Sequence, residues 1–266
     1  MDPELNPYET QKTLSEYLGS FYFDAENPFF NPSFQIDIHY PQDYLTKLAN
    51  VSIHAFQKLT EHSPIVKPPL SALDIGCGVG RLTFELSRYF DKILGIDYSH
   101  LFVKTCVELK NKGLIEYNKR KQGDNFEKII AKIPENTGIS REKVDFIQGD
   151  AENLGEIGEF DLIVASNLID RLGNPEKFLK SVDKFLKKKG VLVLASPYTW
   201  LEEYTKKEMW IGGKEGKESF ENLKTFMKEL GFELMEEMTL KLLIPEHERK
   251  FQLCLPHVTV WARKEV

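Results

Sequence analysis

A glycine-rich turn carries the clearest chemical signal in the sequence. In the run LDIGCGVGR, Asp74 is followed by Gly76, Gly78 and Gly80, directly after a strand-like run and directly before a helical pattern. Glycines at such a turn let the backbone approach a ligand closely. A dinucleotide-binding fingerprint requires GxGxxG, but here the third glycine comes one position early and Arg81 stands in its place. The spacing therefore argues against a nicotinamide cofactor.

The acids around this turn indicate a cofactor that carries positive charge. The Asp74 carboxylate is poorly matched to a pyrophosphate and well matched to an ammonium and a sulfonium. We therefore expect S-adenosylmethionine, with S-adenosylhomocysteine as the product. Asp97 ends the next strand-like run ~20 residues further on, where an acid can accept hydrogen bonds from ribose hydroxyls. Its alternative role is that of a helix N-cap or a loop carboxylate.

Two further strand ends add candidate ligand contacts. The run GDAENL puts Asp150 and Ala151 where an adenine amino group and ring face could be held, although Asp150 could instead serve a turn. In SNLIDRL, Asn167 is expected to touch the methionine part of the cofactor or to orient the nucleophile. Asp170 and Arg171 lie one turn further along, or form a surface ion pair in a capped turn. The complete expected cofactor site is Asp74, Gly76, Cys77, Gly78, Gly80, Asp97, Tyr98, Asp150, Ala151 and Asn167.

Aromatic residues follow the fifth strand-like run. The segments SPYTWLEEYT and MWIGG bring Tyr198, Trp200 and Trp210 to the end of the sheet where ligands bind in open α/β folds. Their rings could form walls on which a planar heterocycle stacks. The alternative is that they pack against helices.

Strand-like and helical patterns alternate from residue 70 onward, which is typical of βαβ units. The sequence predicts an α/β fold with a doubly wound, mostly parallel, seven-stranded sheet and an antiparallel C-terminal edge. The expected strands are Ala72–Ile75, Lys92–Asp97, Val144–Gln148, Phe160–Ser166, Gly190–Ser196, Glu233–Leu243 and His257–Arg263. The expected helices are Gly80–Phe90, His100–Lys112, Pro175–Lys188 and Lys217–Leu230, the last closed by Gly231.

Two segments stand outside this alternation. Residues 1–69 are expected to form an N-terminal helical lid or substrate wall, ahead of a cofactor-binding domain over residues 70–266. The lid contains helical patterns at Glu9–Gly19 and Gln42–Glu61, the Pro- and Phe-rich stretch Asp24–Pro41, and a stiff link at Pro64, Pro68 and Pro69. Residues 113–143 form a polar insertion that is longer than an ordinary connection of ~2–6 residues.

Composition limits the classes of partner. A net charge of −6 disfavours nucleic acid and fits a small or zwitterionic substrate. The basic runs 119–121 and 187–189 are interpreted as a solvated loop and a helix C-terminus. The three cysteines have no spacing for a disulfide framework or a metal site. With an acidic N-terminus and no apolar run near ~18 residues, we expect a cytoplasmic protein that does not enter membranes.

The three strand ends over residues 70–200 resemble the class I methyltransferases, which have a Rossmann-like fold. A narrower resemblance covers nearly the whole chain. Its motifs look like those of the C-terminal methyltransferase domain of ovothiol synthases: YETQKTLSEYL, ALDIGCGVGRLTFELSRYF, SNLIDRL, SPYTWLEEYT, WIGG, ERKFQ and HVTVWARK. The resemblance implies methylation of an imidazole nitrogen of mercaptohistidine (5-thiohistidine). The iron-dependent sulfoxide synthase of that family has no counterpart in this sequence. We therefore expect a free-standing enzyme and a separate sulfoxide synthase that supplies its substrate.

Such chemistry needs positioning and a hydrogen-bond acceptor that fixes the imidazole tautomer. Asp170 is the first candidate for this acceptor and His247 the second. Arg249 could clamp the substrate carboxylate through its planar fork, or could be a surface cation. The expected substrate pocket is enclosed by Tyr8, Tyr17, Tyr198, Trp200 and Arg249. The alternatives are methylation of another small molecule or of a protein histidine, and a noncatalytic protein that binds S-adenosylmethionine.

Overall fold

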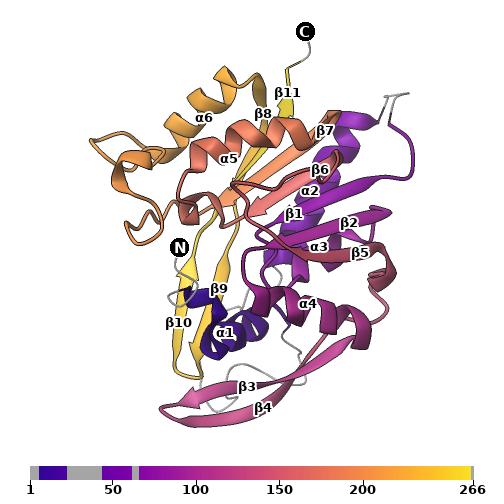
Figure 1. The fold of residues 1–266 in the computed structure, drawn as a ribbon, viewed down its shortest axis with the longest axis vertical. Coiled ribbons are helices and arrows are strands. Elements are labelled where there is room, and N and C mark those ends of the chain that lie inside the picture. The colour runs from indigo at the N-terminus through magenta and orange to yellow at the C-terminus, as the bar shows by residue number, and fades with distance from the viewer. Residues whose placement is uncertain (1–5, 23–43, 62–65, 265–266) are drawn as a thin grey trace.

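The computed structural model describes residues 6–22, 44–61 and 66–264. They contain a seven-stranded sheet in the order β5-β2-β1-β6-β7-β11-β8 (Figure 1). All of its pairings are parallel except those of β11, which runs antiparallel to both β7 and β8. This confirms the predicted doubly wound sheet with an antiparallel C-terminal edge. The strands are β1 (Ser71–Ile75), β2 (Lys92–Asp97), β5 (Val144–Gln148), β6 (Phe160–Ser166), β7 (Leu186–Ser196), β8 (Phe232–Thr239) and β11 (His257–Arg263).

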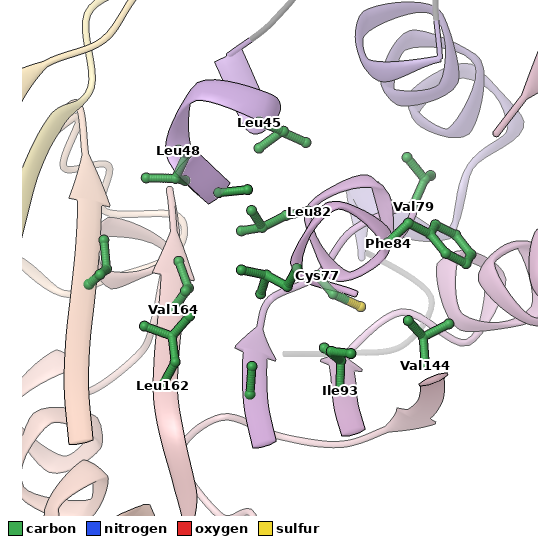
Figure 2. Packing of buried hydrophobic residues seen from close by; sticks show 14 of the residues in the cluster. Leu45, Leu48, Cys77, Val79, Leu82, Phe84, Ile93, Val144, Leu162 and Val164 are labelled. Carbon is green, nitrogen blue, oxygen red and sulfur yellow. The ribbon is translucent and has the colours of Figure 1, made fainter. Parts of the chain in front are cut away.

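Helices cover both faces of the sheet, which explains why most residues of its central strands β1 and β6 are buried and apolar. One face carries α2 (Tyr44–Thr60), α3 (Arg81–Leu86) and α4 (His100–Lys112). The other face carries α5 (Pro175–Val182) and α6 (Ser219–Glu229). Figure 2 shows the first of these layers, where Leu48 of α2 and Leu82 of α3 lie above Val164 of β6. The sheet is thereby held rigid at the strand ends that face the candidate site.

Local sequence signals set the ends of several helices. Ser99 caps α4, because its hydroxyl accepts a hydrogen bond from the N–H of Phe102 at 3.1 Å. Asn174 caps α5 in the same way, through the N–H of Lys177 at 2.9 Å. Gly113 ends α4 in the left-handed conformation, with φ +78°. These caps fix where the chain leaves the sheet and where it returns.

The polar insertion is an antiparallel hairpin formed by β3 (Leu114–Gln122) and β4 (Asn125–Lys132). A second hairpin, β9 (Leu242–His247) with β10 (Lys250–Cys254), lies in the connection from β8 to β11. The prediction of one strand over Glu233–Leu243 followed by a short link was therefore wrong. Pro245 made the second half of this region look like a loop, but proline is compatible with an edge strand.

Both basic runs belong to strands, so the loop and helix-end interpretations of residues 119–121 and 187–189 were wrong. Helix α5 ends at Val182, and a short 3-10 turn, Asp183–Phe185, leads directly into β7. Lysine is a good helix former and suits the last turn of a helix, so the local pattern favoured a helix end over a strand. The Lys187 ammonium lies 2.7 Å from the Asp161 carboxylate on the neighbouring strand, which stabilises the early start of β7.

The N-terminal region contains a short 3-10 helix, Pro7–Glu9, then α1 (Gln11–Phe21) and α2. Helix α1 packs between the β3–β4 and β9–β10 hairpins at one end of the molecule (Figure 1). The predicted stretch Asp24–Pro41 and Pro64 lie outside the described residues. Across the described helices, none combines the length and the apolar character that a membrane crossing requires.

Candidate functional site

The glycine turn lies at the carboxyl ends of β1 and β2. The N–H groups of Gly76 and Cys77 both donate to the Ile96 carbonyl, at 2.8 and 3.0 Å. Gly78 and Gly80 have φ values of +55° and +79°, which side chains disfavour. A Cβ at Gly80 would also lie 2.9 Å from the Phe146 ring. The turn is therefore fixed in a shape that only glycine adopts easily.

Asp97 holds this turn against the start of α4. One carboxylate oxygen accepts the N–H of Gly78 at 2.8 Å, and the other accepts the N–H of Ser99 at 2.9 Å. Burial raises the pKa of Asp97 to about 6. Ser99 is the capping residue of α4, so Asp97 is not the helix cap, but its hydrogen bond from the Ser99 N–H fits the alternative of a loop carboxylate. The carboxylate stands beside the glycine turn, where it suits a ribose.

Asp74 is buried beneath the turn, with 1% of its surface exposed. The Thr83 hydroxyl donates to its carboxylate at 2.7 Å, which ties β1 to α3. Burial raises the pKa of Asp74 to about 7, and the nearby Asp97 adds to the effect. A cationic ligand nearby would favour ionisation of both carboxyl groups, so the pair suits the cofactor expected from the sequence.

The end of β5 completes the predicted group of three strand ends. The N–H of Gly149 donates to the Asp97 carbonyl at 3.0 Å, which brings Asp150 and Ala151 close to the end of β2. Ala151 is buried, whereas Tyr98 is 43% exposed. The Asp150 carboxylate accepts the N–H of Glu152 at 2.9 Å, as expected for a carboxylate in a turn. This hydrogen bond fits the turn role of Asp150, and the predicted contact with adenine stays a prediction.

The N-terminal segment lies across this edge of the sheet. The Tyr17 ring packs against the glycine turn, 3.2 Å from the position of a Cβ on Gly78. The Tyr22 hydroxyl donates to the Val79 carbonyl at 2.8 Å. Burial raises the pKa of both tyrosines, so both remain protonated donors. Helix α1 therefore covers the candidate cofactor site.

Glu9 joins the same segment to α4, a contact that the sequence did not reveal. Its carboxylate accepts the N–H groups of His100 and Leu101 at 2.7 and 3.2 Å. These are first-turn N–H groups of α4, where the helix dipole favours a negative charge. Ser99 adds a hydrogen bond from its hydroxyl to the Tyr8 carbonyl at 3.1 Å. Because Glu9 and α4 lie about ninety residues apart in sequence, no local pattern could have paired them.

The loop after β6 is organised by Asp170. This residue is fully buried, at 0% exposure, so the interpretation as a surface ion pair was wrong. One carboxylate oxygen accepts the Ser196 hydroxyl at 3.1 Å. The other accepts the Thr199 N–H at 2.9 Å and the Arg171 guanidinium at 3.0 Å. Burial raises the pKa of Asp170, and Arg171 opposes that effect. Asp170 thus ties the loop after β6 to the loop after β7.

Arg171 links this loop to the N-terminal segment. Its guanidinium donates to the Thr199 carbonyl at 2.7 Å and lies 5.0 Å from the centre of the Tyr204 ring. It also hydrogen-bonds with the side chain of Tyr8, whose pKa is raised by burial. The Tyr8 and Tyr204 rings are 6.4 Å apart. These contacts place Tyr8 beside the loop after β6, whereas its predicted part in a substrate pocket stays a prediction.

Asn167, at the end of β6, is the most unusual residue of the site. Its φ of +54° lies in the left-handed region, and its N–H donates to the Ala195 carbonyl at 2.7 Å. Its side-chain oxygen is buried and has no hydrogen-bond partner among the described residues. Such an unsatisfied atom typically costs ~1–3 kcal/mol, and backbone strain of this kind clusters at functional sites.

The aromatic side chains predicted to line the substrate pocket have different surroundings in the structure. Trp200 is 8% exposed, its indole N–H donates to the Ser219 hydroxyl at 2.9 Å, and its ring stacks on Trp210 at 6.4 Å. Trp200 is therefore occupied by core packing beneath α6, which corrects its prediction as a substrate wall. The Tyr198 hydroxyl lies 3.1 Å from Nδ1 of His257. Tyr198 also has a left-handed φ of +53°, at the end of β7.

His247 and Arg249 lie at the tip of the β9–β10 hairpin, where the N–H of Arg249 donates to Nδ1 of His247 at 3.3 Å. The base of this hairpin, at Cys254, is near Asp170 and Arg171. At a rise of ~3.3 Å per residue, the tip is roughly 17 Å along the strand from that base. The structure therefore does not bring His247 and Arg249 to the strand ends with Asn167.

The described residues contain no cluster of three His, Cys, Asp or Glu side chains that could hold a metal ion. Cys77, Cys106 and Cys254 are free thiols. The Cys106 thiol lies 3.2 Å from the Gly78 carbonyl and fills space beneath the glycine turn. Cys77 and Cys106 therefore contribute to packing around the turn.

Comparison with known proteins adds sequence relatives. The sequence model of the family described as "Methyltransferase domain" matches residues 73–194. A malonyl-[acyl-carrier protein] O-methyltransferase of Haemophilus ducreyi is 31% identical over 47% of this chain and 40% of its own length. A mitochondrial ubiquinone biosynthesis O-methyltransferase of Dictyostelium discoideum is 24% identical over 66% of this chain and 51% of its own length. The matches thus cover about half or less of these curated relatives.

Solved structures share the fold over nearly the whole chain. A magnesium protoporphyrin IX methyltransferase of Synechocystis PCC 6803, with bound S-adenosylhomocysteine, covers 99% of this chain and all of its own, at a TM-score of 0.54 and 12% identity. A putative RNA methyltransferase of Pyrococcus horikoshii covers 96% of this chain and all of its own, at a TM-score of 0.52 and 14% identity. These likenesses concern the fold. The sequence model of the methyltransferase family matches residues 73–194, which is less than half of the chain.

Proposed function

We propose that the chain is an S-adenosylmethionine-dependent methyltransferase. The observation that carries this proposal is the glycine turn, fixed by Asp97 through the N–H of Gly78 at 2.8 Å. The early third glycine, the buried Asp74 and the acid at the end of β2 suit this cofactor better than a dinucleotide. In the structural relative from Synechocystis, the demethylated cofactor is bound to the same fold.

We further propose that the methyl acceptor is an imidazole nitrogen of mercaptohistidine. The support is the set of motifs that resemble the methyltransferase domain of ovothiol synthases. In this proposal the chain acts in the cytoplasm on a small amino acid, and a separate sulfoxide synthase supplies that substrate. Nucleic acid and membrane surfaces have no part in it.

A second candidate keeps the cofactor but changes the acceptor atom. The relatives from Haemophilus ducreyi and Dictyostelium discoideum are named as O-methyltransferases. An oxygen nucleophile on another small molecule is therefore the alternative.

The residues of this chain would contribute mainly by positioning. When bound, S-adenosylmethionine supplies an electrophilic methyl group. Asp97 would hold the ribose of the cofactor, and the turn at Gly78 would contact the cofactor through backbone atoms. Asp74 would stabilise the positive charge of the cofactor from below the turn. Tyr17 would exclude water by covering the turn. Alignment of reactants in this way can supply ~7–11 kcal/mol of a reaction barrier.

Mass spectrometry of reaction products tests both levels of the proposal. Wild-type protein would be incubated with S-adenosylmethionine and either mercaptohistidine, histidine or a panel of phenolic and carboxylic acceptors. An Asp97→Ala variant serves as the matched control for enzyme-dependent transfer. A product one methyl heavier from mercaptohistidine supports the specific proposal. A product only from an oxygen acceptor refutes it and supports the alternative. Absence of methyl transfer to any acceptor would count against methyltransferase activity.

A further inference from the structure

The inference begins with the buried oxygen of Asn167. A polar atom that is shielded from water and has no partner among the described residues is a place where a ligand's donor can bind. The backbone around it is held in a strained conformation by the hydrogen bond from its N–H to Ala195. The strain and the missing partner occur at the same residue, which points to a function outside folding.

The amide of Asn167 is oriented by Tyr44 of α2. The Tyr44 hydroxyl lies 2.9 Å from the Ser166 hydroxyl, and the Asn167 side chain is within reach of the same hydroxyl. Because the Asn167 oxygen has no hydrogen-bond partner among the described residues, the nitrogen is the end of the amide that contacts Tyr44. Tyr44 is 2% exposed and therefore has little freedom to move. Its contact with the nitrogen of the amide leaves the oxygen available.

This oxygen lies beside the candidate cofactor site. The next residue, Leu168, packs against the glycine turn, where its Cδ1 is 3.0 Å from the position of a Cβ on Gly76. Asn167 itself follows β6, which is the immediate neighbour of β1 in the sheet. A group bound to Asn167 is therefore next to the end of the turn that follows β1.

The two acceptors expected from the sequence are less suitable. Asp170 has no exposed surface, and its carboxylate accepts hydrogen bonds from Ser196, Thr199 and Arg171, at 2.9 to 3.1 Å. His247 is at the tip of the β9–β10 hairpin, and its Nδ1 accepts the N–H of Arg249. Asn167 is the candidate whose acceptor atom is both buried and unsatisfied among the residues that the structure describes.

We propose that the Asn167 side-chain oxygen accepts a hydrogen bond from an N–H of the methyl acceptor, and that Tyr44 is the positioning residue that aims it. This inference rests on the proposed N-methyltransferase function. In an imidazole, an acceptor on one nitrogen holds the proton there and leaves the lone pair on the other. Asn167 thereby selects which of the two ring nitrogens is methylated. The free lone pair forms the new N–C bond as the C–S bond of the sulfonium breaks. The product is a methylimidazolium whose N–H proton stays at Asn167 and passes to water on release, so the neutral amide never takes the proton itself.

The test compares four variants: Asn167→Ala, Asn167→Asp, Tyr44→Phe and the control Tyr89→Phe. Aspartate has nearly the shape of asparagine and retains an acceptor oxygen, whereas alanine removes it. Tyr44→Phe keeps the ring and removes only the hydroxyl that orients the amide. Tyr89 packs against Phe56 and Phe90 and is remote from the site residues described above, so its variant controls for the loss of a tyrosine hydroxyl.

Two measurements are made on each variant. Calorimetry in the presence of S-adenosylhomocysteine gives the affinity for mercaptohistidine without turnover. Magnetic resonance of the product gives the ratio of the two N-methyl isomers. Asn167→Ala should weaken substrate binding roughly 3- to 10-fold, the effect of one lost hydrogen bond, and should yield both isomers. Tyr44→Phe should shift the isomer ratio in the same direction, while Asn167→Asp and Tyr89→Phe should retain a single isomer.

An unchanged isomer ratio in Asn167→Ala would overturn the inference while leaving the proposed function in place. Mixed isomers and weak binding in Asn167→Asp as well would also overturn it, because the amide nitrogen would then be the group that binds the substrate. The wild-type reaction tests the proposed function separately. If wild-type protein gives no methylated mercaptohistidine, the substrate assignment fails and the inference fails with it.

Discussion

Replacing Asp74 by asparagine tests whether the carboxyl group beneath the glycine turn opposes folding. Burial raises its pKa from an ordinary value of 3.8 to about 7. Between these two values the folded protein retains a proton that the unfolded chain has released, so wild-type stability falls as the pH rises through this window. Each pH unit corresponds to ~1.36 kcal/mol, so the ionised carboxylate destabilises the folded state by up to about 4 kcal/mol at pH 8.

The amide introduced by Asp74→Asn cannot ionise, so the variant lacks this dependence on pH. The stability of Asp74→Asn relative to wild type should therefore rise by up to about 4 kcal/mol between pH 4 and pH 8, with most of the rise below pH 7. The altered contact with Thr83 would lower the free energy of unfolding of the variant by the same amount at every pH. It would therefore displace the plot of relative stability against pH without changing its slope. The variant should also bind S-adenosylmethionine more weakly, because the charge that favours the cation is gone.

Urea unfolding of wild type and Asp74→Asn at each pH measures the difference between their free energies of unfolding. Asp124→Asn is the control, because Asp124 is exposed in the turn between β3 and β4. The control should show no change of relative stability with pH. A difference between wild type and Asp74→Asn that is equally flat would refute the reasoning from burial.

Three further outcomes are expected. Asp97→Ala should weaken the binding of S-adenosylmethionine by ~1.5–3 kcal/mol, as measured by calorimetry. The affinity of the wild-type protein should fall below about pH 6, because Asp97 is then protonated. Binding of NADH in place of S-adenosylmethionine would refute the cofactor assignment. Asp170→Ala leaves buried donors unpaired, so it should lower unfolding free energy by ~1–3 kcal/mol as well as turnover; an unchanged urea midpoint would contradict it. Gly78→Ala and Gly123→Ala share positive φ values of +55° and +52°, but only Gly78 meets Tyr17 at 3.2 Å. Only Gly78→Ala should weaken cofactor binding. Equal cofactor affinities in the two variants would argue against Tyr17 covering the turn.

The sheet could be predicted from sequence because its strands are buried on both faces and read as continuous apolar runs. Strand β6 is an example, because four consecutive buried apolar residues, Leu162 to Ala165, follow Asp161. The two hairpins were missed because they are strands of a different kind. Charged residues occupy much of β3, and Pro245 interrupts β9, so their patterns resemble loops.

Part of the candidate site could be predicted from the sequence and part could not. The glycine turn and Asp97 lie within one βαβ unit, where local spacing determines geometry. The contact of Tyr44 with Ser166 joins residues 122 positions apart, and the contacts of Glu9 with α4 join residues 91 and 92 positions apart. No periodicity links such residues. The burial of Asp170 was also beyond reach, because an Asp-Arg pair looks the same in sequence whether it is inside or outside.

The place of β11 in the sheet has a consequence for the order of folding during synthesis. Strand β8 is made before β11, yet its only partner in the described sheet is β11, which separates it from β7. Until residue 263 has been synthesised, β7 therefore has an open edge and β8 has no strand to join. The N-terminal strands can assemble as the chain emerges, whereas this side of the sheet closes in one late step when β11 inserts between its two neighbours.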